Sequence, residues 1–240
     1  MKKLKENSFE DGFSSPDVRK SWDEIAELRN GRDTTSRCVL EAAWRYLKEG
    51  SKILDIGPGT GKYVIALAAR GIEVTPLDFS KKVHELIKEE KKEHDLKGEQ
   101  IIADAVNLPY KDGSFDGAIF FRTVSFLKRD DVEKCLSEIE RVLKNGGVLI
   151  AAFPSTKSDL YELGIKQFKS SKTVMLVGFE RDGLSGLPRN FFDYEDFENY
   201  KKLLEKNFTV KEWRHETANA IVGGQSLLLR DWFLVAEKKV

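Results

Sequence analysis

The chain has 240 residues, enough for one domain with a buried core and modest additions. Its 40 Lys and Arg residues balance its 40 Asp and Glu residues, so no overall basic field favours nucleic acid or an anionic membrane as partner. Two cysteines, without a Cys-x-x-Cys spacing, exclude a disulfide framework and a cysteine zinc site and fit a reducing cytoplasm. No apolar run reaches the roughly 18 residues of a membrane helix, so we expect no membrane association.

Two amphipathic helices are predicted ahead of the first strand. Ser15 and Pro16 suit the start of a helix over residues 16–28, and a second helix is expected over residues 35–48. We therefore treat residues 1–50 as a helical N-terminal extension to a main domain at 51–240.

A glycine-rich stretch follows, reading I-L-D-I-G-P-G-T-G-K from Ile53 to Lys62. A short strand carries Asp55, a loop carries Gly57, Gly59 and Gly61, and a helix begins directly after the loop. Glycines leave the backbone bare, so a ligand can approach the unpaired N–H groups at the helix start. This order predicts a nucleotide-like pocket.

The spacing separates the ligands that use such a loop. A phosphate-binding P-loop needs a glycine where Ile56 stands and a hydroxyl residue where Tyr63 stands. The dinucleotide fingerprint needs a third glycine at the position of Lys62. Both patterns therefore fail, and an acid followed by alternating glycines remains.

Three later strands are predicted to end near polar residues. The strand 73–77 ends in Asp78, whose two oxygens suit the two hydroxyls of a ribose at this edge of a sheet. The strand 100–103 ends in Asp104, for which a turn-capping role is the alternative. The strand 117–121 leads into Arg122, whose guanidinium suits a carboxylate or phosphate of a substrate, or another acid of the chain itself.

The ordered motifs D-x-G-x-G-x-G, A-D-A-x-x-L-P, S-F-D and E-I-E-R-V-L-K-N-G-G-V-L-I resemble those of the class I S-adenosylmethionine (AdoMet) dependent methyltransferases over residues 51–155. The resemblance implies an α/β three-layer sandwich with a mostly parallel seven-stranded sheet, whose last strand is antiparallel. It also implies AdoMet as cofactor and S-adenosylhomocysteine as product. The implied cofactor-binding residues are Asp55, Gly57, Pro58, Gly59, Gly61, Asp78, Phe79, Ser80, Asp104, Ala105, Phe121 and Arg122.

The methyl acceptor is less legible. About 35 residues at 155–190 exceed a simple connector and are expected to form a cap over the acceptor site. In the family, an N-terminal extension often closes over the cofactor as a lid. Candidate substrate contacts are Trp22, Arg122, Ser125 and Tyr161, with sheet packing as the alternative for Trp22.

The C-terminal part is predicted to hold two antiparallel strands, at 209–214 and 232–237, joined by a long link that contains Gly223 and Gly224. His215 follows the first of them and is either a base or a structural histidine. The last strand matches the reversed strand of the family.

The sequence therefore predicts methyl transfer from AdoMet to an acceptor, with a small molecule favoured and protein or RNA left open. No Asn-Pro-Pro-Tyr motif follows the fourth strand, which disfavours a nucleic-acid amine methylase. The sequence identifies no catalytic residue, since an in-line transfer from a sulfonium needs little acid–base catalysis. The alternatives are a non-catalytic AdoMet-binding protein and a nicotinamide-dependent oxidoreductase.

Overall fold

The structure is a computed structural model, which describes residues 23, 24, 26, 36–96, 98–164, 172–175, 188–222 and 224–240. Its centre is a seven-stranded sheet in the order β3-β2-β1-β4-β5-β9-β8. The strands are β1 (Lys52–Ile56), β2 (Glu73–Asp78), β3 (Ile101–Ile102), β4 (Phe115–Phe121), β5 (Leu143–Pro154), β8 (Phe208–Val222) and β9 (Gln225–Lys238). Strands β1 to β5 pair in parallel, and β9 runs antiparallel to both of its neighbours. The predicted mostly parallel sheet with a reversed last strand is confirmed.

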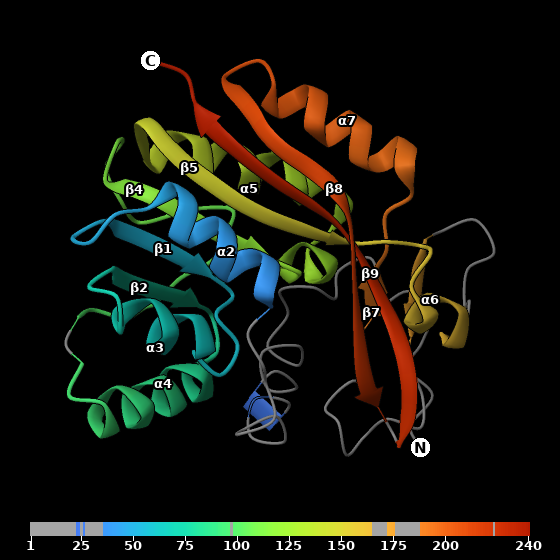
Figure 1. Ribbon diagram of the computed structural model, residues 1–240, viewed down its shortest axis with the longest axis horizontal. Helices are drawn as coiled ribbons and strands as arrows, with labels where there is room; N and C mark the ends of the chain where they lie inside the picture. The colour runs from blue at the N-terminus through green and yellow to red at the C-terminus, as the bar shows by residue number, and fades with distance from the viewer. Residues whose placement is uncertain are drawn as a thin grey trace.

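Helices cover both faces of this sheet (Figure 1). One face carries α2 (Arg37–Tyr46), α3 (Lys62–Ala68) and α4 (Lys81–Glu93), and the other carries α5 (Arg129–Val142) and α7 (Tyr194–Leu204). Each helix turns an apolar stripe inward, as Val39 of α2 and Ile139 of α5 show by being fully buried. Such side chains each stabilise the fold by about 1.5–3 kcal/mol. The expected three-layer sandwich is therefore present.

The N-terminal extension divides into two parts. The second predicted helix exists as α2, and it is a core element, since Cys38, Val39, Ala42 and Ala43 are buried in the same cluster as β1 and β5 residues. Most of the first predicted helix lies outside the described residues, so a lid stays a prediction for that part. Cys38 and Cys135 are both free and buried, as expected of core cysteines.

The predicted long link between the last two strands is wrong. Strands β8 and β9 stay paired up to Val222 and Gln225, and Gly224 has a φ of +77°. Two glycines suit the left-handed backbone of a two-residue hairpin turn, which lets both strands run much further than expected. The pair Pro154–Asp231 is the last that β5 makes with β9, so the hairpin continues beyond the sheet (Figure 1).

The described part of the segment predicted to form a cap contacts both this hairpin and the sheet edge. It contains α6 (Asp159–Leu163) and a small antiparallel sheet of β6 (Thr173–Met175) and β7 (Pro188–Asn190). Asn190 Nδ2 donates to Leu127 O at 2.7 Å, just after the short 3₁₀ helix η2 (Thr123–Phe126) that follows β4. The backbone N–H of Leu228 donates to Asp159 Oδ2 at 2.7 Å. The cap is thus tied to the carboxyl edge on one side and to the hairpin on the other.

Among the described residues, no helix combines the length and the apolar character needed to cross a membrane.

Candidate functional site

The carboxyl ends of β1, β2 and β4 meet at one edge of the sheet, because these neighbouring strands are parallel. This edge receives Asp55 with the glycine loop, Asp78 at the end of β2, and Phe121 at the end of β4. Open α/β sheets bind ligands at this edge. The structure therefore brings together most of the residues that the sequence predicted for the cofactor.

The glycine loop adopts a backbone that favours glycine at three positions. Gly57, Gly59 and Gly61 have φ values of +68°, +57° and +84°. A Cβ on Gly57 would lie 2.4 Å from Thr123 Oγ1, and one on Gly61 would lie 2.7 Å from Ile87 Cγ1. At Gly57 and Gly61, glycine is thus required by the protein's own packing. Pro58, also predicted for the site, is buried in the same loop.

Asp55 is the most unusual side chain of the edge. It is 2% exposed, and its Oδ2 has no hydrogen-bond partner within the described part of the chain. Burial, with a smaller contribution from the charge of Asp78, raises the pKa of Asp55 to about 7. A buried carboxylate of this kind is suited to a cationic or hydrogen-bond-donating ligand.

Asp78 ends β2 next to the N-cap of α4. Ser80 N donates to Asp78 Oδ1 at 2.9 Å, while the Ser80 hydroxyl oxygen accepts from Val83 N at 3.2 Å, so Ser80 caps the helix. Desolvation raises the pKa of Asp78 to about 6, against the opposing effect of the bond from Ser80. Phe79, between the two, is half-buried.

Asp104 lies where the third strand ends, and its carboxylate makes a local turn. Asp104 Oδ1 accepts from Val106 N at 3.2 Å, which is the turn-capping role that the sequence left as an alternative. Ala105 beside it is 8% exposed. A contact of this pair with adenine stays a prediction.

Arg122 has its guanidinium bound to an acid of the chain, which was the other role considered for it. Its Nε and Nη2 lie 2.9 and 2.6 Å from Asp231 Oδ2, and Nε also lies 3.1 Å from Oδ1. The same guanidinium stands over the Phe121 ring, with 5.0 Å between Cζ and the ring centroid. Arg122 therefore joins the end of β4 to the point where the hairpin leaves the sheet.

The other three candidate substrate residues differ in burial and in whether the structure describes them. Ser125 is 2% exposed and donates its hydroxyl to Arg122 O at 2.7 Å. Tyr161 on α6 is half-buried, with its ring 5.3 Å from that of Phe191. Trp22 lies outside the described residues. Their contacts with an acceptor stay predictions.

His215 faces away from this edge, in keeping with the structural alternative. It pairs with Trp232, its ring centroid lies 4.4 Å from that of Trp232, and burial lowers its pKa. Asp231 directly precedes Trp232 in β9, so its side chain points to the opposite face of the hairpin from Trp232 and His215. His215 is thus separated by the hairpin from the Arg122–Asp231 pair.

Two residues at the edge were missed by sequence reasoning. Asp231 carries no motif, and only the strand register brings it to Arg122. Tyr63 was noted only as the wrong residue for a P-loop, but its hydroxyl accepts from Ser36 N at 3.0 Å and its ring lies 5.8 Å from Phe121. Tyr63 thereby connects the start of α2 to the base of the glycine loop.

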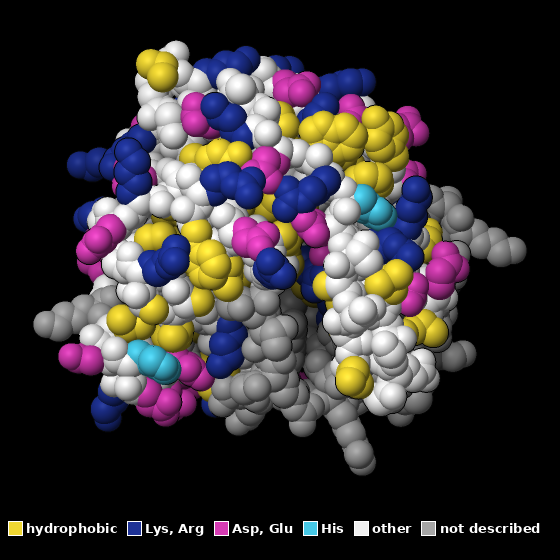
Figure 2. Space-filling view, in the orientation of Figure 1, with side chains coloured by type: hydrophobic (Ala, Val, Ile, Leu, Met, Phe, Trp, Pro, Cys, Tyr) yellow, Lys and Arg dark blue, Asp and Glu magenta, His cyan; other side chains and the backbone are white. Residues whose placement is uncertain are grey.

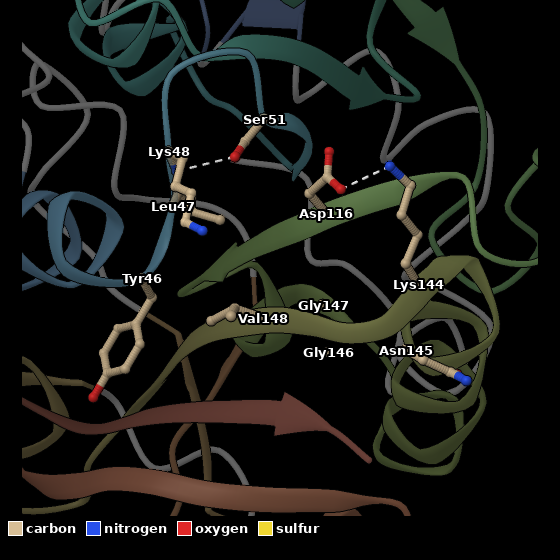
Figure 3. A pocket seen from close by; sticks show the side chains of 10 residues that line it. All are labelled: Tyr46, Leu47, Lys48, Ser51, Asp116, Lys144, Asn145, Gly146, Gly147 and Val148. Atoms are coloured by element: carbon tan, nitrogen blue, oxygen red, sulfur yellow. Dashed lines mark hydrogen bonds and ion pairs between the residues drawn. The ribbon is translucent and has the colours of Figure 1, made fainter. Parts of the chain in front are cut away.

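A hollow of about 280 Å³ lies at the opposite, amino-terminal edge of the sheet and is drawn in Figure 3. Its polar groups pair with one another. Asp116 binds Lys144 Nζ at 2.7 Å and accepts from Lys52 N at 2.9 Å, and Lys48 N donates to Ser51 Oγ at 3.0 Å. Because these groups are satisfied internally, the hollow lacks the unpaired carboxylate that marks the carboxyl edge.

The donor and acceptor set at the carboxyl edge fits AdoMet. The unpartnered Oδ2 of Asp55 can accept from or pair with a cationic group, Asp78 can accept from hydroxyls, and the loop backbone lies bare between them. Within the described residues, no group of three or more His, Cys, Asp or Glu side chains is arranged to hold a metal ion.

A family model and several similar proteins are methyltransferases. Residues 54–151 match the model of a methyltransferase domain family. A demethylmenaquinone methyltransferase of Clavibacter sepedonicus is 34% identical over 198 residues, covering 79% of this chain and 76% of that protein. An O-methyltransferase of Aspergillus nomiae is 32% identical over 135 residues, which is 55% of this chain and 59% of the relative. A SAM-dependent methyltransferase structure from Methanosarcina mazei superposes with a TM-score of 0.70 at 22% identity, covering 87% of this chain and all of that one.

Proposed function

Since the chain belongs to the class I AdoMet-dependent methyltransferases, we propose that AdoMet binds at the carboxyl edge described above and gives its methyl group to a small hydroxylated ring compound. Bound there, AdoMet supplies a sulfonium methyl that is already a strong electrophile. The observation that carries the assignment is the buried, unpartnered Oδ2 of Asp55 next to three left-handed glycines.

In this proposal the residues of the edge bind and orient. Asp78 accepts hydrogen bonds from the ribose hydroxyls, and Asp55 supplies the negative charge that a cationic ligand requires. Asp104 and Ala105 hold the adenine with their backbone and the remaining carboxylate oxygen. The aromatic face of Phe121 favours a nearby sulfonium by cation–π attraction, about 0.5–2 kcal/mol.

Orientation is the main contribution of the protein to the reaction. Holding both reactants in line contributes roughly 7–11 kcal/mol in favourable systems, without a dedicated general base. The tie between cap, hairpin and sheet edge, through the Arg122–Asp231 and Asn190–Leu127 contacts, keeps the acceptor side in place and excludes water. Because orientation of the reactants is the main contribution, the reaction does not require a catalytic triad, and none is recognisable in the sequence.

The acceptor class is inferred from relatives and from charge. One relative is named for demethylmenaquinone and another for O-methylation. Taken together, the two names support a ring compound as the proposed acceptor, with its hydroxyl or the ring carbon beside it as the nucleophile. On the face drawn in Figure 2, the Lys and Arg side chains of the described residues are interspersed with Asp and Glu. This distribution, with the equal numbers of basic and acidic residues in the chain, favours a small acceptor over nucleic acid. We place the enzyme in the cytoplasm, where its two free cysteines stay reduced.

The test is an assay for S-adenosylhomocysteine release. Purified protein is incubated with AdoMet and either a reduced demethylated naphthoquinone or simple phenols, and product mass and NMR locate the new methyl group. We expect turnover with at least one ring acceptor. Calorimetric binding of AdoMet without product from any ring compound would contradict the acceptor class, and absence of AdoMet binding would contradict the proposed site.

A further inference from the structure

A carboxylate from the N-terminal segment reaches the start of α4. Asp23 Oδ1 accepts from the Ser80 hydroxyl at 2.5 Å and from the Lys82 backbone N–H at 3.2 Å. The two partners stand 57 and 59 positions further along the chain, so these contacts are tertiary. The first N–H groups of a helix have no partner within the helix, and Asp23 satisfies one of them.

Ser80 is shared between two carboxylates. Its backbone N–H donates to Asp78 Oδ1 at 2.9 Å, and its hydroxyl proton goes to Asp23. Ser80 is 1% exposed, so both bonds form out of water and both involve a charged acceptor, which makes them stronger than neutral bonds. The position of Ser80, and with it the turn that carries Asp78, is therefore defined from both sides.

We propose that Asp23 is a positioning residue for cofactor binding, which acts through Ser80 to hold the turn that presents the Asp78 carboxylate at the site edge. The inference rests on the proposed AdoMet site and adds to it a residue outside every motif. Asp23 does not touch the cofactor in this arrangement. Its effect is exerted on the geometry and on the charge of Asp78.

The first test compares two substitutions of Asp23. Asp23→Ala removes both hydrogen bonds, and we expect AdoMet affinity to fall about fivefold, since such bonds each contribute modestly. Asp23→Asn keeps a carbonyl oxygen that accepts from the same two donors, so it should restore most of the affinity. Isothermal titration with AdoMet at pH 8 measures both, and steady-state kinetics should place the loss in KM with kcat retained. The control is Glu24→Ala, an exposed neighbour, which should bind as the unaltered protein does.

The second test asks whether Asp23 acts through Ser80. In Ser80→Ala the hydroxyl is lost, so adding Asp23→Ala should weaken AdoMet binding by much less than it does alone. Residues in one hydrogen-bond network are non-additive in this way, whereas independent residues add. Full additivity of the two losses would overturn the proposed route.

The third readout is the pH dependence of affinity, which a purely structural residue would not move. The titratable groups around Asp78 are Asp55 from β1, His84 from α4 and Asp23 from the N-terminal segment. Burial is the main cause of the raised pKa of Asp78, and the charge of Asp23 adds a small contribution, so Asp23→Asn should shift the loss of AdoMet affinity on acidification slightly to lower pH. This variant keeps the bonds, and it therefore remains informative if Asp23→Ala fails to fold.

The outcomes distinguish failure of the proposed AdoMet site from failure of the proposed role of Asp23. If the unaltered protein does not bind AdoMet, the proposed function fails. If it binds and Asp23→Ala binds equally well, the role of Asp23 fails while the site stands.

Discussion

The carboxyl edge of the sheet holds two buried carboxylates whose surroundings are opposite. Asp231, 6% exposed, is bound by two nitrogens of Arg122, whereas Asp55, 2% exposed, has an Oδ2 without a partner among the described residues. A buried charge that is paired belongs to the scaffold, because removing its partner is costly. One that stays unpaired lowers stability and is characteristic of a site where the ligand completes the pairing. The difference divides the edge into an acceptor-side scaffold and a cofactor-side binding surface.

The largest effect is expected from Asp231→Ala. It leaves Arg122 unpaired in a mostly buried position, and we expect the free energy of unfolding to fall by about 3 kcal/mol, reduced somewhat because the guanidinium is one-third exposed. Urea denaturation measures the change. The matched control is Glu237→Ala on the same hairpin. The Glu237 side chain is 38% exposed against 8% for Asp231, so the loss of its ion pair with Lys211 should cost less than about 1 kcal/mol.

The double substitution Arg122→Met with Asp231→Leu sharpens the same point. Replacing both charges by apolar groups should recover most of the lost stability, because no buried charge is left unpaired. If Asp231→Ala proves as stable as the unaltered protein but loses affinity for the acceptor, the pair is a substrate clamp and not a scaffold.

Asp55→Asn should show the reverse pattern. AdoMet affinity should fall by about 2 kcal/mol in titration calorimetry, since a charge-assisted contact is lost. Stability should stay equal or rise by up to about 1 kcal/mol at pH 8, because a desolvated charge is removed. The control Asp116→Asn alters a carboxylate already satisfied by Lys144 and Lys52, and AdoMet binding should be unaffected. A large loss of stability in Asp55→Asn would place Asp55 in the scaffold class.

The pH dependence tests the same contrast without mutation. The pKa of Asp55 is raised to about 7 and that of Asp78 to about 6, so between pH about 4 and 7 the folded protein binds more protons than the unfolded chain. The free energy of unfolding of the free protein should therefore fall as pH rises through this window. AdoMet favours ionised Asp55, so its affinity should rise by about tenfold from pH 6 to pH 8. Thermal denaturation and calorimetry at several pH values give both slopes, and Asp55→Asn should flatten each. A pH-independent affinity would contradict the assignment of Asp55.

The cofactor half of the edge was predictable from sequence because local patterns determine it. A strand, alternating glycines and a helix start place Asp55 and the loop together. The cap of α4 is equally local, because the Ser80 side chain accepts from Val83 N, three residues further along the chain. The mostly parallel sheet was implied by the family resemblance, and the reversed strand followed from two late strands with no helix between them. Even here the reason for Gly57 was incomplete, since its contact with Thr123 depends on two loops that are distant in sequence.

The acceptor half was not predictable, since its contacts join residues far apart in the chain. Arg122 and Asp231 are separated by 109 positions, and their meeting depends on the register of an antiparallel pair. The length of that hairpin was underestimated, because residues 215–222 lack a clean apolar alternation and Gly223-Gly224 was interpreted as part of a loop instead of a tight turn. The Arg122–Asp231 pair is formed by residues far apart in the chain and therefore has no sequence motif, whereas Asp55 and the glycine loop are contiguous and form one.

The smallest expected effect belongs to Asp78→Ala, which tests whether the cofactor half is a set of separate contacts. Its carboxylate is already held by Ser80 N, so the fold loses little, and AdoMet affinity should fall by about 1 kcal/mol through lost bonds to the ribose. Removal of this charge also lowers the pKa of Asp55, because Asp78 is the charge that helps to raise it. In Asp78→Ala the rise of AdoMet affinity with pH should therefore begin at lower pH than in the unaltered protein. Titrations with AdoMet from pH 5.5 to pH 8 measure both effects. Unchanged affinity at pH 8 would mean that another acid serves the ribose, and an unshifted profile would mean that the two carboxylates act independently.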